Sequence, residues 1–208
     1  MNSGHVIAIV GAESTGKSTL AEQLCAALRA EGRDAAFVPE YLREFCDRVR
    51  RTPVQSEQAH IAFEQTRRIA AAAAVHDLVI ADTTALMIAV YSDLVFDDAS
   101  LYAEAEQAHR RSDLTLLTAL DLPWEADMLR DGEHVREPVD AMVRAALQRA
   151  GSGYSVVGGS GEARLAAALT MVRRVLHPPD MVEGPRWQWV CERCGDMECE
   201  RHLLPRGS

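Results

Sequence analysis

The sequence predicts an α/β fold in which a parallel sheet of about five strands is flanked by helices and followed by a short cysteine-rich tail. Three observations predict it. Short apolar runs alternate with longer helical patterns, which is the order of elements in a parallel sheet. A glycine-rich segment directly follows the first apolar run and begins the first helical pattern. A length of 208 residues, with 48% hydrophobic and 25% charged residues, suits one ordinary folded domain.

The predicted strands are β-branched apolar runs at 6–10, 35–38, 78–81, 114–118 and 155–157. The predicted helices carry apolar residues at three-four spacing, at 17–30, 56–75, 84–91, 101–111, 139–150 and 162–176. Pro178 and Pro179 end the last helix. We therefore predict a main domain over residues 1–177 and a separate tail over residues 178–203. Residues 204–208 look like the remnant of a protease site added for purification, and a native ending stays open.

Composition narrows the classes of function. The net charge of -9 argues against nucleic-acid binding, which requires clustered Lys and Arg. No apolar run reaches the roughly 18 residues of a membrane helix, and the N-terminus lacks a basic leader. A cytoplasmic location without membrane contact is therefore expected.

The glycine-rich segment matches the phosphate-binding pattern G-x-x-x-x-G-K-[ST] in the expected place, between a strand and a helix. Its backbone N–H groups and the helix N-terminus are expected to hold the phosphates of ATP. Lys17 is the only lysine among 22 basic residues, which suggests that its position requires a flexible ammonium group. The segment predicts a P-loop NTPase or kinase fold. The ATP-binding residues predicted in it are Gly11, Glu13, Ser14, Thr15, Gly16, Lys17, Ser18 and Thr19.

Two carboxylates follow the second and third predicted strands, and the carboxyl ends of parallel strands face one crevice. Asp82 is expected to hold Mg²⁺ together with Ser18, although it could serve only as a helix N-cap. Glu40 is expected to accept a proton from an attacking hydroxyl or to orient it, although it could be an ordinary first-turn glutamate. Which of the two acts as the base stays open.

A guanine-reading pattern would need a lysine in the segment Thr118 to Asp121, and none is present. Adenine is therefore favoured, with the glycine-rich turn at Gly159 as its expected neighbour. Single histidines at 5, 60, 76, 109, 134 and 177 lack partners at ligand spacing and receive no role.

Four segments together resemble the ribosylnicotinamide kinase domain of NadR-type proteins: 11–20, 39–45, 81–83 and 121–131. The resemblance covers roughly residues 5 to 175. It implies an ATP-dependent kinase that phosphorylates the 5'-hydroxyl of nicotinamide riboside, a step in NAD synthesis. Met128 departs from the glycine usual in that family. No H-x-G-H motif is present, so adenylyl transfer would fall to another protein.

The segment 121–131 matches that family's lid, and cations from a lid can surround a phosphoryl group in transfer. Arg130 is expected to close over the γ-phosphate, with Arg136 as second choice, although both could be solvated helix residues. Trp124 is expected to stack on a cationic pyridinium ring, with a plain hydrophobic anchor as the alternative. The residues expected to bind the acceptor are Glu40, Tyr41, Arg43, Trp124 and Asp127; the expected catalytic residues are Lys17, Glu40, Asp82 and Arg130.

Two other functions remain open from the sequence: a kinase for another nucleoside or small molecule, and a nucleotide-sensing ATPase or regulator. The sequence does not indicate the oligomeric state.

The tail contains Cys191, Cys194, Cys199 and His202 in a C-x₂-C-x₄-C-x₂-H arrangement. Four such ligands within twelve residues predict a closed structural Zn²⁺ site. A reduced cysteine cluster or a redox pair is the alternative.

Overall fold

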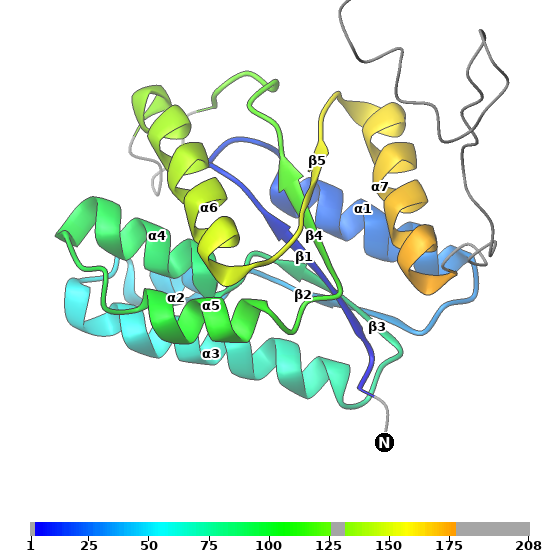
Figure 1. The fold of residues 1–208 in the computed structure, drawn as a ribbon, viewed down its shortest axis with the longest axis horizontal. Helices are drawn as coiled ribbons and strands as arrows, with labels where there is room; N and C mark the ends of the chain where they lie inside the picture. Colours follow the sequence, from blue (N-terminus) through cyan, green and yellow to red (C-terminus); the bar gives the residue numbers. More distant parts are fainter. Residues whose placement is uncertain (1–2, 126–131, 178–208) are drawn as a thin grey trace, which may run out of the picture. The chain divides into compact units, whose positions relative to one another are not determined.

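The computed structural model of the protein describes residues 3–125 and 132–177. Five strands form one parallel sheet, as predicted, and the structure shows their order to be β2-β3-β1-β4-β5 (Figure 1). The strands are β1 (His5–Val10), β2 (Ala35–Val38), β3 (Leu78–Asp82), β4 (Leu114–Thr118) and β5 (Ser155–Val157). The central strands β1 and β3 are almost wholly buried, which is typical of a parallel sheet covered on both faces.

The helices cover both faces of this sheet (Figure 1). One face packs against α1 (Lys17–Ala30) and α7 (Gly161–Leu176). The other carries α2 (Tyr41–Val49), α3 (Gln55–Ala73), α4 (Ala85–Phe96), α5 (Tyr102–His109) and α6 (Arg136–Ala150), which the short 3-10 helix η1 (Glu133–Val135) precedes. Alternate residues of β1 separate the two cores, since Ile7 and Ile9 face α1 and α7 while Val10 faces the larger helical layer.

Several helices differ from the predicted ranges, among them α2, α4 and α6. α2 is a separate nine-residue helix that the range predictions omitted. α4 continues to Phe96 and ends where Asp97 adopts a left-handed conformation, with φ 53°. α6 begins at Arg136 rather than at 139, because Pro138 falls in its first turn, where the missing N–H costs no helical bond.

Contacts along the chain divide it into two units, Met1–His177 and Pro178–Ser208. Cys191, Cys194, Cys199 and His202 of the expected zinc site lie outside the described residues. Among the described residues, no helix is both long and apolar enough to span a membrane.

Candidate nucleotide-binding site

The glycine-rich loop connects the carboxyl end of β1 to the first residue of α1, as predicted. Gly11 has a φ of 147°, and a Cβ there would lie 2.2 Å from the Thr118 Oγ1 atom. Gly16 has a φ of 72°, and a Cβ there would lie 2.9 Å from Leu122 Cδ1. Gly11 therefore needs glycine for its backbone conformation and its close approach to Thr118, and Gly16 for its left-handed backbone.

Buried hydrogen bonds on the side of the loop that faces the protein interior hold its shape. The Thr15 hydroxyl is fully buried and lies 2.7 Å from both the Ala12 carbonyl oxygen and Thr118 Oγ1. Arg164, in α7, donates to the Thr15 carbonyl oxygen at 2.6 Å and is itself 5% exposed. Burial lowers the pKa of this guanidinium, and the nearby Asp121 carboxylate partly opposes that shift. The side chain of Thr15 therefore supports the loop from the protein interior.

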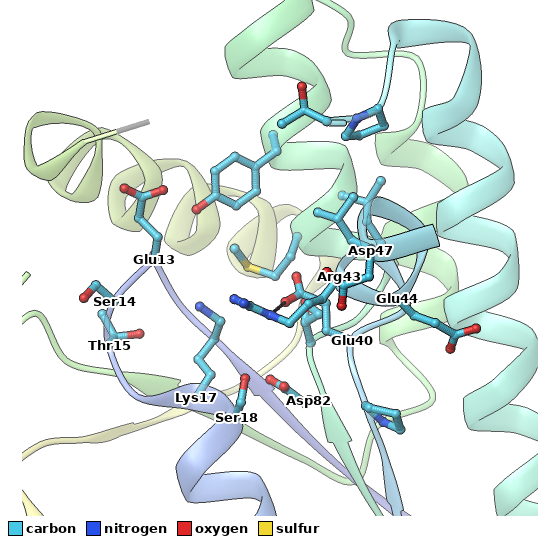
Figure 2. Close-up of a pocket in the computed structure, with 18 of the residues that line it drawn as sticks. Glu13, Ser14, Thr15, Lys17, Ser18, Glu40, Arg43, Glu44, Asp47 and Asp82 are labelled. Carbon is cyan, nitrogen blue, oxygen red and sulfur yellow. Dashed lines mark ion pairs between the residues drawn. The ribbon is translucent and has the colours of Figure 1, made fainter. Parts of the chain in front are cut away.

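Lys17, Ser18 and Asp82 gather at the ends of β1 and β3 (Figure 2). The Lys17 Nζ donates to the Ala12 carbonyl oxygen at 2.7 Å. Asp82 is the last residue of β3 and only 2% exposed, and this burial raises the pKa of its carboxyl group. A hydrogen bond from Ser18 and the charges of Lys17 and Arg43 lower the pKa in part.

Asp82 and its neighbour Ser18 provide oxygen atoms that suit Mg²⁺ as ligands. Its buried Oδ1 atom has no hydrogen-bond partner among the described residues, and the Ser18 hydroxyl adjoins its carboxyl group. A carboxylate and a hydroxyl next to a phosphate site are oxygen ligands of the kind that Mg²⁺ takes. Among the described residues, no group of three or more His, Cys, Asp or Glu could hold a metal by itself. Phosphates and water would therefore have to complete the coordination of the ion.

Glu40 lies at the start of α2, where β2 ends, and is the N-cap residue without a capping bond from its side chain. Its carboxylate pairs with Arg43, one turn on, at 4.0 Å (Figure 2). The next acidic residue, Glu44, is bound by Arg68 of α3, which lowers the pKa of the Glu44 carboxyl group. The Glu40 side chain also lines the cavity beside the loop.

A single cavity of about 880 Å³ adjoins the loop and both carboxylates. One part is lined by Glu13 and the loop residues through Thr19, and another by α2 and the carboxyl-terminal half of α4, with Tyr91 and Phe96. A volume of this size is within the usual range of small-molecule sites. Six carboxylates and two cationic side chains line it among the described residues. The carboxylates belong to Glu13, Glu22, Glu40, Glu44, Asp47 and Asp82, and the cations to Lys17 and Arg43.

Other residues predicted for the site lie elsewhere. Tyr41 is 3% exposed and packs against Phe45, His60 and Arg68, so its ring belongs to the contact between α2 and α3. The Trp124 indole N–H donates to Glu13 Oε1 at 3.2 Å, and the Gly132 backbone N–H donates to the same oxygen at 3.2 Å.

Arg136, the second choice for the γ-phosphate, is 6% exposed and donates to the Leu122 carbonyl oxygen at 2.9 Å. Tyr41, Trp124 and Arg136 are thus not among the described residues that line the cavity. Gly159 turns with a φ of 81°, and its N–H donates to the Asp121 carboxylate. Arg130 and Asp127 lie outside the described residues.

Sequence reasoning missed several residues of this region. Arg164, Gln65, Tyr91 and Phe96 sit in ordinary helical patterns, and nothing in their local sequence separates them from neighbouring helix residues. Only the packing of helices against the sheet brings them to the loop and the cavity.

A glycine loop between a parallel strand and a helix, with a buried carboxylate at the end of the neighbouring strand, defines a P-loop nucleotide-binding protein. The chain belongs to the AAA domain family, whose model matches residues 6–164. Among curated proteins, none matches the chain by sequence.

Solved structures of NadR share the fold. The structure of NadR in complex with NAD and AMP-PNP matches with a TM-score of 0.67 and 20% identity, over 89% of this chain and 52% of that one. NadR in complex with NR matches with a TM-score of 0.68 and 20% identity, over 83% of this chain and 50% of that one. The chain therefore spans about half the length of these proteins. The predicted resemblance to NadR is confirmed for the fold.

Proposed function

We propose that the protein is an ATP-dependent kinase that phosphorylates the 5'-hydroxyl of a nucleoside, with nicotinamide riboside as the acceptor. One observation carries the proposal: a single cavity contains the phosphate loop, the two strand-end carboxylates and a separate part with aromatic side chains. A phosphoryl donor and an organic acceptor can occupy such a cavity together. Transfer between them requires mainly positioning and charge stabilisation.

The phosphate loop would hold ATP at one end of the cavity. Loop N–H groups and the N-terminus of α1 bind the phosphate oxygens, and Lys17 neutralises charge on the transferring phosphoryl group. Ser18 and Asp82 would hold Mg²⁺, which neutralises phosphate charge when it is bound. Arg130 stays a candidate for the lid cation because of the family resemblance. Arg136 is buried at the start of α6 and donates to the Leu122 carbonyl oxygen instead.

The acceptor would lie beside Glu40, between the phosphates and α4. Glu40 is better placed than Asp82 to serve the acceptor hydroxyl, because Asp82 adjoins Ser18 and Lys17 of the phosphate loop. Glu40 instead pairs with Arg43 on α2, which lines the acceptor part of the cavity. We therefore assign Glu40 to the acceptor hydroxyl and Asp82 to the metal.

The charge of the cavity supports a cationic acceptor. Six carboxylates against two cationic side chains leave a negative balance among the described lining residues. ATP adds further negative charge, so a pyridinium ring in the acceptor would relieve repulsion as Mg²⁺ does. The aromatic residues in that part are Tyr91 and Phe96 rather than Trp124. A cation over such a ring gains about 0.5 to 2 kcal/mol. The NadR neighbours, solved with NR and with AMP-PNP, are consistent with this acceptor and donor.

The test is incubation of the protein with ATP, Mg²⁺ and a panel of nucleosides, followed by chromatography of the products. We expect nicotinamide mononucleotide to form faster than any purine or pyrimidine nucleotide. Preference for thymidine or uridine would limit the assignment to nucleoside kinase. Release of free phosphate without a phosphorylated nucleoside would instead indicate an ATPase or a nucleotide-sensing regulator.

A further inference from the structure

A glutamine of α3, Gln65, is fully buried next to the site without lining the described part of its cavity. Its Oε1 atom accepts the backbone N–H of Tyr41 at 2.8 Å. Its Nε2 atom faces the carbonyl oxygens of Pro39 at 3.4 Å, Asp82 at 3.4 Å and Thr83 at 3.3 Å. A buried amide is costly unless it is hydrogen-bonded, and here both ends of the amide have partners.

These partners fix the orientation of the amide. A backbone N–H only donates and carbonyl oxygens only accept, so a flipped Gln65 would set oxygen against three oxygens and NH₂ against N–H. The side chain therefore acts as a directional link, with its acceptor toward α2 and its donor toward the end of β3. An apolar side chain of the same size would fill the space without making the link.

The link joins the two turns that carry the strand-end carboxylates. Pro39 and Tyr41 flank Glu40, while Asp82 ends β3 and Thr83 follows it. The ladder between β2 and β3 stops at the pair Val38 and Ala81, one residue before Asp82. Beyond that pair, the chain after β2 leads into α2, while β3 continues for one residue, Asp82, beside Ile9 of β1 before the chain leads into α4. Gln65 thus continues the connection between the two strands past the last pair of the ladder.

The turn after Asp82 needs such support. Thr83 has a φ of 68°, a left-handed conformation that a β-branched residue rarely adopts. Such conformations are strained and persist where the surroundings determine them. Two hydrogen bonds do so here: the Thr83 N–H donates to Ile9 O at 3.0 Å, and its carbonyl accepts from Gln65. The buried Thr83 Oγ1 atom, like Asp82 Oδ1, has no partner among the described residues.

We propose that Gln65 is a positioning residue that sets the distance between the Glu40 and Asp82 carboxylates. This inference rests on the proposed function, since it assigns Glu40 to the acceptor and Asp82 to Mg²⁺. Gln65 touches neither ligand. It acts through the backbone of both turns, so its loss displaces the acceptor-side carboxylate relative to the metal-side one.

The experiment compares Gln65→Met with Gln65→Glu. Methionine matches the size of glutamine without its hydrogen bonds. We expect Gln65→Met to lower kcat by about ten- to a hundredfold, because small misplacements of reacting groups cost that much. The affinity for Mg²⁺-free ATP should stay within about twofold of wild type, since among the described residues Gln65 bonds to Pro39, Tyr41, Asp82 and Thr83 and not to the phosphate loop.

Gln65→Glu tests the direction of the link. A protonated glutamic acid has one O–H, which can donate to one of the three carbonyl oxygens, whereas its carboxylate is repelled by all of them. Burial favours the protonated form. Activity of Gln65→Glu relative to wild type should therefore rise as the pH falls, and that of Gln65→Met should not. A role limited to packing would give no such difference between the pH profiles.

Thr66→Ala is the matched control, because its hydroxyl bonds only to the Ala62 carbonyl of its own helix, at 3.0 Å. A wild-type kcat in Gln65→Met would overturn the proposal, as would a loss equal to the unfolded fraction measured by circular dichroism. If wild type phosphorylates no nucleoside, the proposed function fails. In that case the role of Gln65 is tested separately, by measuring how much Mg²⁺ increases the affinity for ATP. Gln65→Met should lose that gain and Thr66→Ala should keep it, and retention by both would overturn the inference.

Discussion

At the scale of single residues, burial and neighbours separate side chains that the sequence treats alike. Asp82 and Glu40 both follow a strand, yet Asp82 is almost completely buried beside the phosphate loop while Glu40 pairs with Arg43 on α2. Trp124 donates its N–H to Glu13, whereas Phe37, Tyr91 and Phe96 are the aromatic residues among the described lining of the cavity. The chemistry expected of each residue follows from these surroundings.

Lys17→Ala should abolish phosphoryl transfer and leave the fold intact. The ammonium group is placed to neutralise charge that grows in the transition state, and it donates to the Ala12 carbonyl oxygen in the loop itself. Lys17→Arg should not restore activity, because a planar guanidinium does not replace a compact point charge. Product formation and circular dichroism measure the two effects. Wild-type turnover by Lys17→Ala would end the assignment of the loop.

Glu40→Gln should lower kcat far more than it weakens ATP binding, because the carboxylate serves the acceptor. Asp82→Asn should instead change the Mg²⁺ dependence.

Folding raises the pKa of Asp82 above its ordinary value of 3.8, so the native state binds this proton more tightly than the unfolded chain does. Stability from this group is lost as the pH rises through the raised pKa. Asp82→Asn should therefore increase Tm at pH 7. If instead Glu40→Gln changed the Mg²⁺ dependence and Asp82→Asn mainly lowered kcat, the roles assigned to Glu40 and Asp82 would be reversed.

Phe96→Leu should reduce the preference for nicotinamide riboside over uncharged nucleosides, because leucine keeps apolar area and removes the aromatic face. Trp124→Leu should leave that preference nearly unchanged, since its indole ring is not among the described residues lining the cavity. Ratios of kcat/KM for nicotinamide riboside and uridine give the comparison. A larger effect from Trp124→Leu than from Phe96→Leu would indicate that Trp124, after β4, contacts the pyridinium ring.

At the scale of elements, α3, α4 and α5 are tied to the sheet by buried polar contacts. His109, the last residue of α5, is 2% exposed and lies between two hydroxyls. Its Nδ1 is 3.0 Å from Thr84 Oγ1 at the start of α4, and its Nε2 is 2.9 Å from Thr115 Oγ1 in β4. His109, which has no partner at ligand spacing in the sequence, therefore connects two helices and a strand.

Stability should fall below pH 6.5 because of His109. Burial lowers its pKa from 6.5 to about 4, so the unfolded chain binds the proton first as the pH falls. The contribution is complete above pH 6.5 and is lost toward pH 4, by about 3 kcal/mol. Urea unfolding of wild type and His109→Gln across this range measures it as a difference, in which the contribution of Asp82 cancels. Parallel profiles for the two proteins would contradict the assignment.

At the scale of the whole molecule, the main unit Met1–His177 contains all of the described site, and the tail is a separate unit. A short tail has too little core to fold alone, so the zinc site predicted from its cysteines stays a prediction about a structural metal. It has no assigned part in phosphoryl transfer. The activity of the main unit should therefore not depend on it.

Elemental analysis of protein purified without chelator should give about one zinc per chain, as a closed four-ligand site binds. A Cys191→Ser/Cys194→Ser double variant should lose the zinc and keep its kinase activity. Wild-type protein free of metal would refute the site. Loss of activity together with the metal would instead assign the tail a part in the function of the main unit.

The sequence by itself determined the sheet, its five strands and the phosphate loop, because these depend on local pattern: apolar runs, helical periods, and glycines at positions that no other residue can occupy. It also located both carboxylates, since parallel strands all end at one edge. Only the tertiary structure decided which side chains face the cavity. Tyr41 and Arg136 are directed into contacts with neighbouring helices and backbone, while Gln65 and Phe96 reach the site from helices packed against the sheet. The physical reason is that the packing of distant elements sets the direction of a side chain, which a local pattern does not contain.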